Sequence, residues 1–556
     1  MTIGLFAEER YEFIGPERAT LSGGPANPFQ PPWRRPICAF VGILAGLTGG
    51  LGNGLITVNT TQLLGSLGLE ADEMAWIPTV YAMTYISMNL LLVRFRQQFG
   101  LRLFSLIALS AFCIVIALHL TVHGFAGAVL VHAAAGVAAA PMTSLSVYYL
   151  MSAFPPKKVL GGVILGLGLS QLPTPLARLF SPDLLAHNEW RSLYLFEFGL
   201  ALLCLGCVAL VRLPPSKREP SFERLDFVTY PLFAAGASLL CAVAGMGRVV
   251  WWTDADWLGW ALASALPLLG LAVYIEANRA RPLIDLQWLG TPGIIRFAVV
   301  VFMSRIVLVE QSSSVIGMLS VLGVDNDQLR LLSLLLLIAS VAGALTAAFL
   351  VRPHRITVIG AFAIGLVAVG ALLDANSTNL TRPPQLYASQ MLIAFATTLF
   401  IGPSLLFGVS FVVRQGGKAL PSLLVLFVVL QILGSLVGNA FLGTFQILRE
   451  KAISVILVGQ LTATDPMVAA RLRGSSAALL PSNADGVQRE GDALAALHQQ
   501  MTREATILSY NNTFALVAAL AAATTLYLLI LVFLHWRRGE PLSAAAAATA
   551  TRGAAA

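Results

Sequence analysis

The stretch that decides the fold runs from Val129 to Arg178 and reads VLVHAAAGVAAAPMTSLSVYYLMSAFPPKKVLGGVILGLGLSQLPTPLAR. Two long apolar runs flank a short basic turn that contains Lys157 and Lys158. At about 1.5 Å of rise per residue, each run is long enough to cross a hydrocarbon core of roughly 30 Å. Small residues crowd both runs and let neighbouring helices approach closely in lipid. The stretch therefore predicts two membrane helices joined on the cytoplasmic side.

The whole chain has the composition of a polytopic membrane protein. Of its 556 residues, 57% are hydrophobic and 11% are charged, which is too apolar for a soluble protein. The formal net charge of +7 comes from Lys and Arg in short clusters between apolar runs, which follows the positive-inside rule and argues against nucleic acid as a partner. The five cysteines lie in apolar runs, so we expect no disulfide framework.

Motifs of ATP-driven pumps and of metal sites are absent from the sequence. There is no glycine-rich loop with Gly-Lys-Ser/Thr, no His-Glu-x-x-His and no paired cysteine cluster. We therefore expect no enzyme activity, no metal and no cofactor.

We predict an all-α protein with fourteen transmembrane helices. Basic residues occur in every second connection, which places both termini in the cytoplasm. The expected location is the inner (plasma) membrane of a bacterium, with the lipid bilayer around the helices. The predicted spans are 37–60, 74–93, 103–122, 125–151, 159–180, 192–212, 226–246, 257–276, 296–322, 331–351, 356–373, 386–411, 421–446 and 511–535.

A weak internal repeat divides the chain. Pro141 and Pro403 each precede a basic turn at nearly the same distance, as expected for a transporter built from two similar bundles. Helical patterns at 448–461 and 492–508 predict that the last two spans continue beyond the bilayer. The predicted organisation is a disordered cytoplasmic tail at 1–36, an N-terminal six-helix bundle at 37–212, a cytoplasmic loop at 213–225, a two-helix insert at 226–276, a cytoplasmic loop at 277–295, a C-terminal six-helix bundle at 296–538 that includes a periplasmic loop at 447–510, and a disordered cytoplasmic tail at 539–556.

Several segments resemble the major facilitator superfamily. They are the loop at 94–102, AGVAAAPMTSLS followed by FPPKK, EWRSLYLFEFG, and RPLIDL at 281–286. The pattern is most similar to the fourteen-span drug:proton antiporter-2 branch, the EmrB-type multidrug efflux permeases. The resemblance implies the major facilitator fold and proton-driven export of an organic, amphipathic or aromatic compound by alternating access. It also implies a periplasmic adaptor (membrane fusion) protein and an outer-membrane channel as partners.

The chain departs from that branch at several motif positions. The first span of that branch usually has an acidic residue a little before a Val-Asn pair. Here Asn53 or Gly54 stands in the place of the acid, and only Asn59 matches the motif. The usual arginine of the fourth span is His132, and the usual asparagine of the sixth is Glu197. These differences leave open an uptake carrier or uniporter of the same fold, and a transport-inactive membrane sensor or scaffold.

Few ionisable side chains lie inside the predicted spans, where each costs about 2.5–3.5 kcal/mol on insertion scales. We predict that Glu310 carries protons; a structural ion pair with Arg305 is the alternative. Glu197, which we expect to pair with Arg178, and His132 are further proton-coupling candidates. For His132, the alternative is a hydrogen-bonded packing residue.

Uncharged polar side chains are expected either to line a substrate cavity or to bond neighbouring helices to each other. The cavity candidates are Asn53, Asn59, Tyr85, Gln171, Gln311, Gln390 and Gln431. Arg94, Arg96 and Arg102 form a candidate gating loop, because arginines at a helix end can hold carbonyls and carboxylates of neighbours in a latch. Plain anchoring at the membrane interface is the alternative.

Overall fold

The computed structural model describes residues 30–155, 158–185, 190–214, 220–279, 281–352, 355–414, 419–461, 465–478 and 485–538. All regular elements in these ranges are helices. Most of the two predicted tails, at 1–29 and 539–556, lies outside the described residues, as does Lys157 of the basic turn.

The first part of the chain forms nine α-helices within the described residues. A short 3-10 turn, η2 (Pro32–Arg34), leads into α1, and another, η4 (Leu169–Gln171), joins α5 to α6. The helices are α1 (Arg35–Val58), α2 (Thr60–Leu67), α3 (Ala71–His119), α4 (Gly124–Ala153), α5 (Val159–Gly168), α6 (Pro173–Leu185), α7 (Arg191–Leu210), α8 (Asp226–Met246) and α9 (Asp256–Ala277).

The second part forms nine more within the described residues. Pro292 opens α11 at a position where its missing N–H costs nothing, and α11 and α12 meet at Val309. The helices are α10 (Leu286–Leu289), α11 (Pro292–Leu308), α12 (Glu310–Val321), α13 (Arg330–Leu350), α14 (Ile356–Asp374), α15 (Tyr387–Arg414) after η5 (Pro383–Leu386), α16 (Leu420–Gln460), α17 (Pro466–Ala478) and α18 (Gly486–Arg538).

Twelve helices among the described residues are long and apolar enough to cross a membrane. The count is thirteen if the bent pair Val159–Gln171 and Pro173–Leu185, with an angle of 43°, is one span. The 49-residue α3 contains a break at Gly100, whose φ of 74° and ψ of 162° are not helical. The chain is thus a multi-pass membrane protein.

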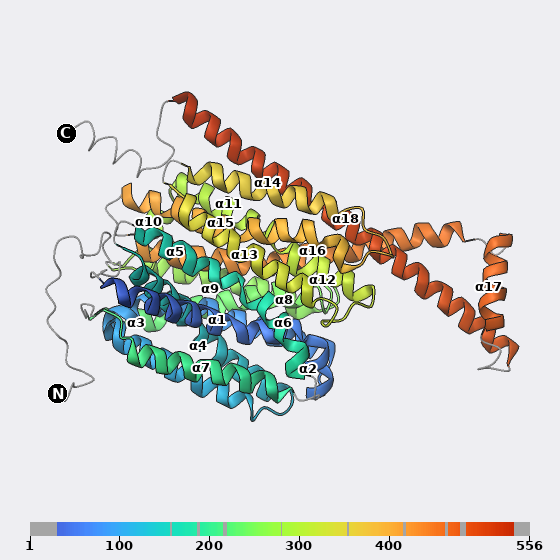
Figure 1. Cartoon of the computed structure of the whole chain (residues 1–556), viewed down its shortest axis with the longest axis horizontal. Helices are drawn as coiled ribbons and strands as arrows, with labels where there is room; N and C mark the ends of the chain where they lie inside the picture. The colour runs from blue at the N-terminus through green and yellow to red at the C-terminus, as the bar shows by residue number, and fades with distance from the viewer. Residues whose placement is uncertain are drawn as a thin grey trace.

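The helices lie roughly parallel, and the described chain begins and ends at the same end of the bundle (Figure 1). We call this the termini end. At the opposite end, α16, α17 and α18 project well beyond the other helices as an arm (Figure 1), and we call this the arm end. The predicted helical continuation of the last two spans is confirmed, because α16 runs to Gln460 and α18 starts at Gly486.

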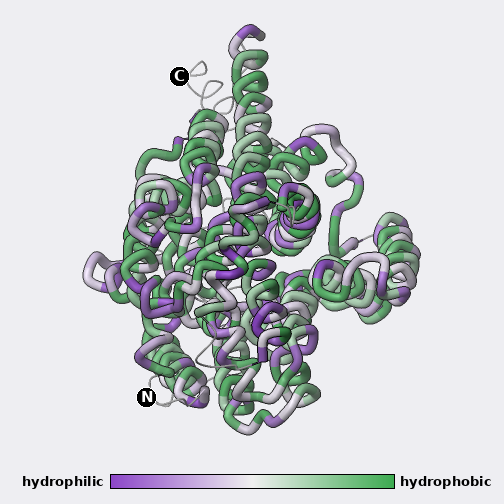
Figure 2. Tube along the Cα trace, turned by 90° about the vertical axis from the view of Figure 1, so that its right-hand side faces the viewer, coloured by the Kyte–Doolittle hydropathy of each residue, from purple (hydrophilic) through white to green (hydrophobic). Residues whose placement is uncertain are grey.

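Apolar side chains cover much of the outer surface. Leu210, Trp260 and Phe227 are 85%, 74% and 73% exposed, as expected of residues that face lipid. Viewed from the arm end, hydrophobic segments predominate along the helices (Figure 2).

The buried apolar side chains form a large core in each half of the chain, and smaller clusters, such as the one that joins Leu90 to Val425, connect the halves. The largest core of the first half joins α1, α3, α4 and α7 around Tyr149 and Phe112. The largest core of the second half joins α14, α15 and α18 around Phe400 and Val517. Helix α8 packs against both α3 and α16, and α9 packs on α8.

One glycine in each half permits a very close helix contact. A Cβ on Gly136 of α4 would lie 2.4 Å from the backbone oxygen of Tyr81 on α3. A Cβ on Gly343 of α13 would lie 2.3 Å from the backbone oxygen of Phe395 on α15. Backbone cannot move aside as a flexible side chain can, so both positions require glycine.

We expect Gly136→Ala and Gly343→Ala each to destabilise the protein by about 1–3 kcal/mol, the usual cost of overpacking. Thermal unfolding of the purified protein in detergent, followed by tryptophan fluorescence, measures this. Gly199→Ala and Gly259→Ala are the matched controls, because nothing lies within 4 Å of the added Cβ. Equal melting temperatures for all four variants would contradict the close contacts.

Candidate functional site

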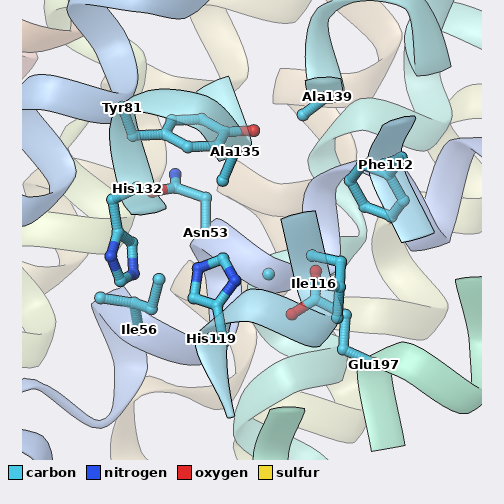
Figure 3. A pocket seen from close by; sticks show the side chains of 12 residues that line it. Asn53, Ile56, Tyr81, Phe112, Ile116, His119, His132, Ala135, Ala139 and Glu197 are labelled. Carbon is cyan, nitrogen blue, oxygen red and sulfur yellow. The ribbon is translucent and has the colours of Figure 1, made fainter. Parts of the chain in front are cut away.

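The first polar cluster lies inside the first half, where α1, α3, α4 and α7 meet. Asn53, His119, His132 and Glu197 line a small pocket with Tyr81 (Figure 3). About 10 Å³ is open to the centre of a water-sized sphere, which is roughly the room for one water molecule. We call this group the N cluster. It is too small to hold an organic substrate.

Hydrogen bonds fix the two histidine rings of the N cluster. His132 Nδ1 lies 2.7 Å from the Ala128 carbonyl oxygen, and His119 Nδ1 lies 3.0 Å from that of Val115. A carbonyl oxygen only accepts, so each Nδ1 carries hydrogen and each neutral ring presents a basic Nε2. The ring centroids are 4.7 Å apart in an edge-to-face arrangement.

The N cluster has buried acceptors without donors. His132 Nε2, Asn53 Oδ1 and both carboxylate oxygens of Glu197 lack hydrogen-bond partners among the residues that the structure describes. Glu197 is 1% exposed and His132 is 2% exposed. Because all four atoms accept when Glu197 is ionised, what they lack is hydrogen, and a bound proton or a water would supply it. The pairing predicted for Glu197 and Arg178 is therefore not formed; Arg178 is buried and its Nε has no partner.

The second polar cluster, which we call the C cluster, lies inside the second half. Gln390 Nε2 donates to Asp374 Oδ2 at 2.7 Å, and the Ser389 hydroxyl donates to Asp374 Oδ1. Gln311 Nε2 donates to the backbone oxygen of Gln390 at 3.0 Å. Glu310 is fully buried at the joint between α11 and α12, near enough to Asp374 for their charges to interact.

Among the described residues, neither carboxylate oxygen of Glu310 has a hydrogen-bond partner at bonding distance, although the Gln390 amide lies near enough to influence it. Two buried carboxylates that interact cannot both be ionised cheaply, so the pair favours holding a proton. The C cluster is therefore a place in the second half where a proton can be held between two acids.

The two clusters occupy corresponding places in the two halves. His119 ends α3 and Asp374 ends α14, each just before the helix that carries His132 or Gln390. Asn53 lies on α1, and Glu310 lies on the first long helical segment of the second half. The sequence repeat thus extends to the buried polar groups.

Arg305 lies apart from both clusters and connects the two halves. Its Nη1 donates to Gln171 Oε1 at 3.4 Å, and its Nε donates to the backbone oxygen of Gln431 at 3.2 Å. The ion pair between Arg305 and Glu310 that we considered as an alternative is not formed, since Glu310 lacks partners. Helix α11 ends before Glu310, so the two side chains do not share one regular helix.

The remaining cavity candidates bond helices to each other. Tyr85 hydroxyl lies 3.0 Å from Thr143 Oγ1 within the first half. Asn59 bonds to Ser181 and accepts from Asn326 Nδ2 at 3.2 Å, which joins the two halves at the arm end. The seven candidates therefore fall into separate groups instead of lining one cavity.

A second contact joins the halves at the arm end. Arg330 Nη2 lies 2.6 Å from Asp183 Oδ1, between α13 and α6. With the bond from Asn326 to Asn59, it links the two halves at this end.

The gating-loop arginines hold backbone carbonyls at the termini end. Arg94 donates to the backbone oxygens of Ser221 at 2.6 Å and Arg281 at 3.0 Å, and Arg102 donates to that of Leu213 at 2.8 Å. Arg96 donates to the Tyr148 hydroxyl at 2.5 Å. Two of the three arginines thus fasten the segments on either side of α8 and α9.

Next to this loop, Arg279 joins three carboxylates. Its guanidinium lies 2.6 Å from Asp226, 2.7 Å from Glu276 and 2.9 Å from Glu223. Burial alone would lower the pKa of Arg279, but the hydrogen bonds to Asp226, Glu223 and Glu276 outweigh it and raise that pKa above its ordinary value. Arg279 therefore stays charged and fixes the ends of α8 and α9 together.

The residues of these clusters that sequence reasoning missed include His119 and Asp374. His119 falls inside the predicted third span, but was not distinguished from its apolar neighbours. Asp374 follows directly after the predicted end of the eleventh span at 373, so it read as a loop residue. The signal available for Asp374 was an acidic residue adjoining an apolar run.

Two helical halves with an internal repeat, buried polar clusters and a polar bridge between them define the architecture of a membrane transporter. Residues 41–380 match the family model described as Major Facilitator Superfamily. This range is more than half of the chain, and the chain belongs to that family. Its members are transporters rather than enzymes. No curated protein sequence matches the chain.

Solved structures of transporters share the fold. The human organic anion transporter MFSD10 (TETRAN) has 14% identity and a TM-score of 0.51, with 88% of this chain and 100% of that chain covered. The proton:xylose symporter XylE has 14% identity and a TM-score of 0.52, with 88% of this chain and 95% of that chain covered. Tetrameric PepTSo2 has 12% identity and a TM-score of 0.52, with 90% of this chain and 99% of that chain covered. At such low identity the likeness shows the fold alone.

We expect Arg279→Met to lower the free energy of unfolding by about 3–5 kcal/mol, because it leaves buried carboxylates without their counter-ion. Arg281→Met is the control, since Arg281 is exposed and contributes its backbone oxygen to Arg94. Denaturation in mixed micelles measures the difference. Indistinguishable stabilities of the two variants would show that the three carboxylates do not depend on Arg279.

Proposed function

We propose that the protein is a secondary active transporter that exports an organic, amphipathic or aromatic compound in exchange for protons by alternating access. The observation that carries the proposal is Glu310, a fully buried carboxyl group with no partner beside a second acid, Asp374. A group in this setting serves little structural purpose, because an unpaired buried charge is costly. Binding and releasing a proton gives it a purpose.

The N cluster supports the same proposal. Its unpartnered acceptors lie at the place that corresponds to the C cluster, so each half has a buried group able to take up a proton. In this proposal Glu197 and His132 replace the first-span acid and fourth-span arginine of the EmrB-type permeases. The proton would pass between Glu197 and the histidines inside a pocket that holds about one water molecule, and the substrate would not take part in this transfer.

We also propose that the chain crosses the membrane fourteen times, with both termini in the cytoplasm of a bacterial cell. Support for the number comes from the break at Gly100, which divides α3 into two segments that are each long enough to span. Counting α5 and α6 as one bent span adds the remaining crossing. With this count we also propose the division into two six-helix bundles and a two-helix insert, and membership of the drug:proton antiporter-2 branch, which the resemblance in the sequence supports.

In this proposal the arm is periplasmic and contacts an adaptor protein, which connects the transporter to an outer-membrane channel. The 41 residues of α16 extend over about 60 Å, roughly twice the hydrocarbon thickness. Val455, Ile456 and Val458 lie near its far end and are 73%, 61% and 53% exposed. Exposed apolar side chains beyond the bilayer favour a protein partner over solvent.

We expect Glu310→Gln to abolish proton-driven flux in proteoliposomes while the protein remains folded, because the amide cannot release a proton. Flux of fluorescent aromatic compounds is followed under an imposed pH gradient. Glu490→Gln, an exposed glutamate of the arm, is the control and should transport normally.

The same experiment distinguishes the alternatives. Full pumping by Glu310→Gln would remove Glu310 from the mechanism. Inward or uncoupled flux by the unaltered protein would favour an uptake carrier or a uniporter. An absence of flux for a broad panel would favour the sensor or scaffold.

The arm contact has its own test. We expect the triple variant Val455→Ser, Ile456→Ser, Val458→Ser to lose the apolar contact with a periplasmic adaptor. The adaptor should then no longer co-purify with the full chain from membranes of its host. Gln488→Ala, at an exposed polar position of α18, should not. If the adaptor still co-purifies with the triple variant, or if none co-purifies with the unaltered protein, the arm is not an adaptor contact.

A further inference from the structure

The side chain of Arg305 lies deep in the protein, between its two halves. Arg305 is thirteen residues after Pro292, which places it about 20 Å along α11, within the hydrocarbon thickness of roughly 30 Å. One of its partners, Gln171, ends the 3-10 turn at the bend of the α5 and α6 pair. The other, the backbone oxygen of Gln431, belongs to α16.

The charge of Arg305 is not compensated. Among the described residues, no carboxylate oxygen lies within 4 Å of the Arg305 guanidinium. Its two hydrogen bonds go to neutral oxygens. Glu310, five residues later, is without partners and does not supply a counter-ion. A cation at this depth normally pairs with an anion, so the missing partner calls for an explanation.

Arg305 also retains hydrogen-bonding capacity. The side chain is half-buried. Its stem packs closely on Gly434 of α16, since a Cβ there would lie 2.9 Å from Arg305 Cβ and 3.5 Å from the Phe302 ring. A guanidinium has five N–H donors, of which these bonds use two, and both bonds are long at 3.2 and 3.4 Å.

We infer that Arg305 binds the carboxylate of the transported compound, which makes the substrate class an organic anion with an apolar body. The inference rests on the proposed transport function and specifies its substrate. The planar guanidinium matches a carboxylate with two parallel hydrogen bonds, and the apolar side chains around it, such as Phe302, accept the rest of the molecule.

A purely structural role predicts a different behaviour. If Arg305 only linked Gln171 to Gln431, its removal would change the stability of the protein and not the ligand preference. If it binds the substrate, its removal changes the preference between an acid and the corresponding amide. The anion would also replace weak bonds that join the two halves, so binding would act where the halves move relative to each other.

The test measures equilibrium binding to the purified full chain in nanodiscs, without a gradient. The probes are 2-naphthoate and octanoate, each beside its amide and its amine, and tryptophan fluorescence reports binding. At least one carboxylate should bind more tightly than its amide and its amine. Arg305→Gln should weaken that carboxylate by roughly 10- to 100-fold, the loss expected for a charge-assisted contact, and should leave amide binding unchanged. Arg305→Lys should retain part of the preference.

Arg382→Gln is the control for loss of a positive charge, since Arg382 is exposed and bonds to carbonyls of its own loop. The inference is overturned if neither carboxylate binds better than its amide, if the amine binds best, or if Arg305→Gln leaves the carboxylate preference intact. If Arg305→Gln does not fold, Arg305→Lys provides the test: a smaller preference for the carboxylate over its amide supports the inference, and an unchanged preference overturns it. Because no pH gradient is used, this result is independent of the Glu310→Gln flux experiment.

Discussion

The cost of placing charge and unpaired polar groups in an apolar interior governs this structure. The chain limits this cost in two ways. Charged groups at the ends of the bundle are paired or bonded to carbonyl oxygens, and few charged groups lie inside the bundle. At the termini end, Arg279 pairs with three carboxylates and Arg94 binds backbone oxygens. Inside the halves, the buried atoms without partners among the described residues include both carboxylate oxygens of Glu197 and of Glu310 and Nε2 of His132. The exceptions to the rule therefore mark the positions at which chemistry is expected.

The repeat gives these exceptions a common origin. In both halves the polar group includes residues from the first helical segment, the end of the third and the start of the fourth, and the N cluster adds Glu197 from α7. The residues differ, with two histidines and a glutamate in one half and two acids in the other, but each set contains side chains that can exchange protons. Close helix contacts at Gly136 and Gly343 repeat as well. A scaffold that was duplicated thus retains its geometry while its polar side chains diverge.

Much of the fold could be predicted from the sequence, because lipid demands long apolar helices and leaves little choice of secondary structure. The extended α16 and α18 correspond to helical patterns in the sequence. The bend between α5 and α6 was not predicted, and the predicted loop at 94–102 is helical except at Gly100, where α3 breaks. What the sequence could not supply was the direction of each side chain around its helix. Glu310 and Arg305 are near neighbours in the chain, yet the joint at Val309 separates them. Asp374 was missed because an apolar pattern does not fix a helix end to one residue.

Helix α16 is one continuous element from the termini end to the arm, and it carries Gln431 beside Arg305 as well as Val455 on the arm. The 24 residues between them make a stiff rod of about 36 Å. A small tilt at the level of Gln431 is therefore enlarged into a displacement of several ångströms at the tip. Helix α16 would then act as a lever: binding of a ligand at Arg305 would change the position of the arm, and a protein bound to the arm would respond to it.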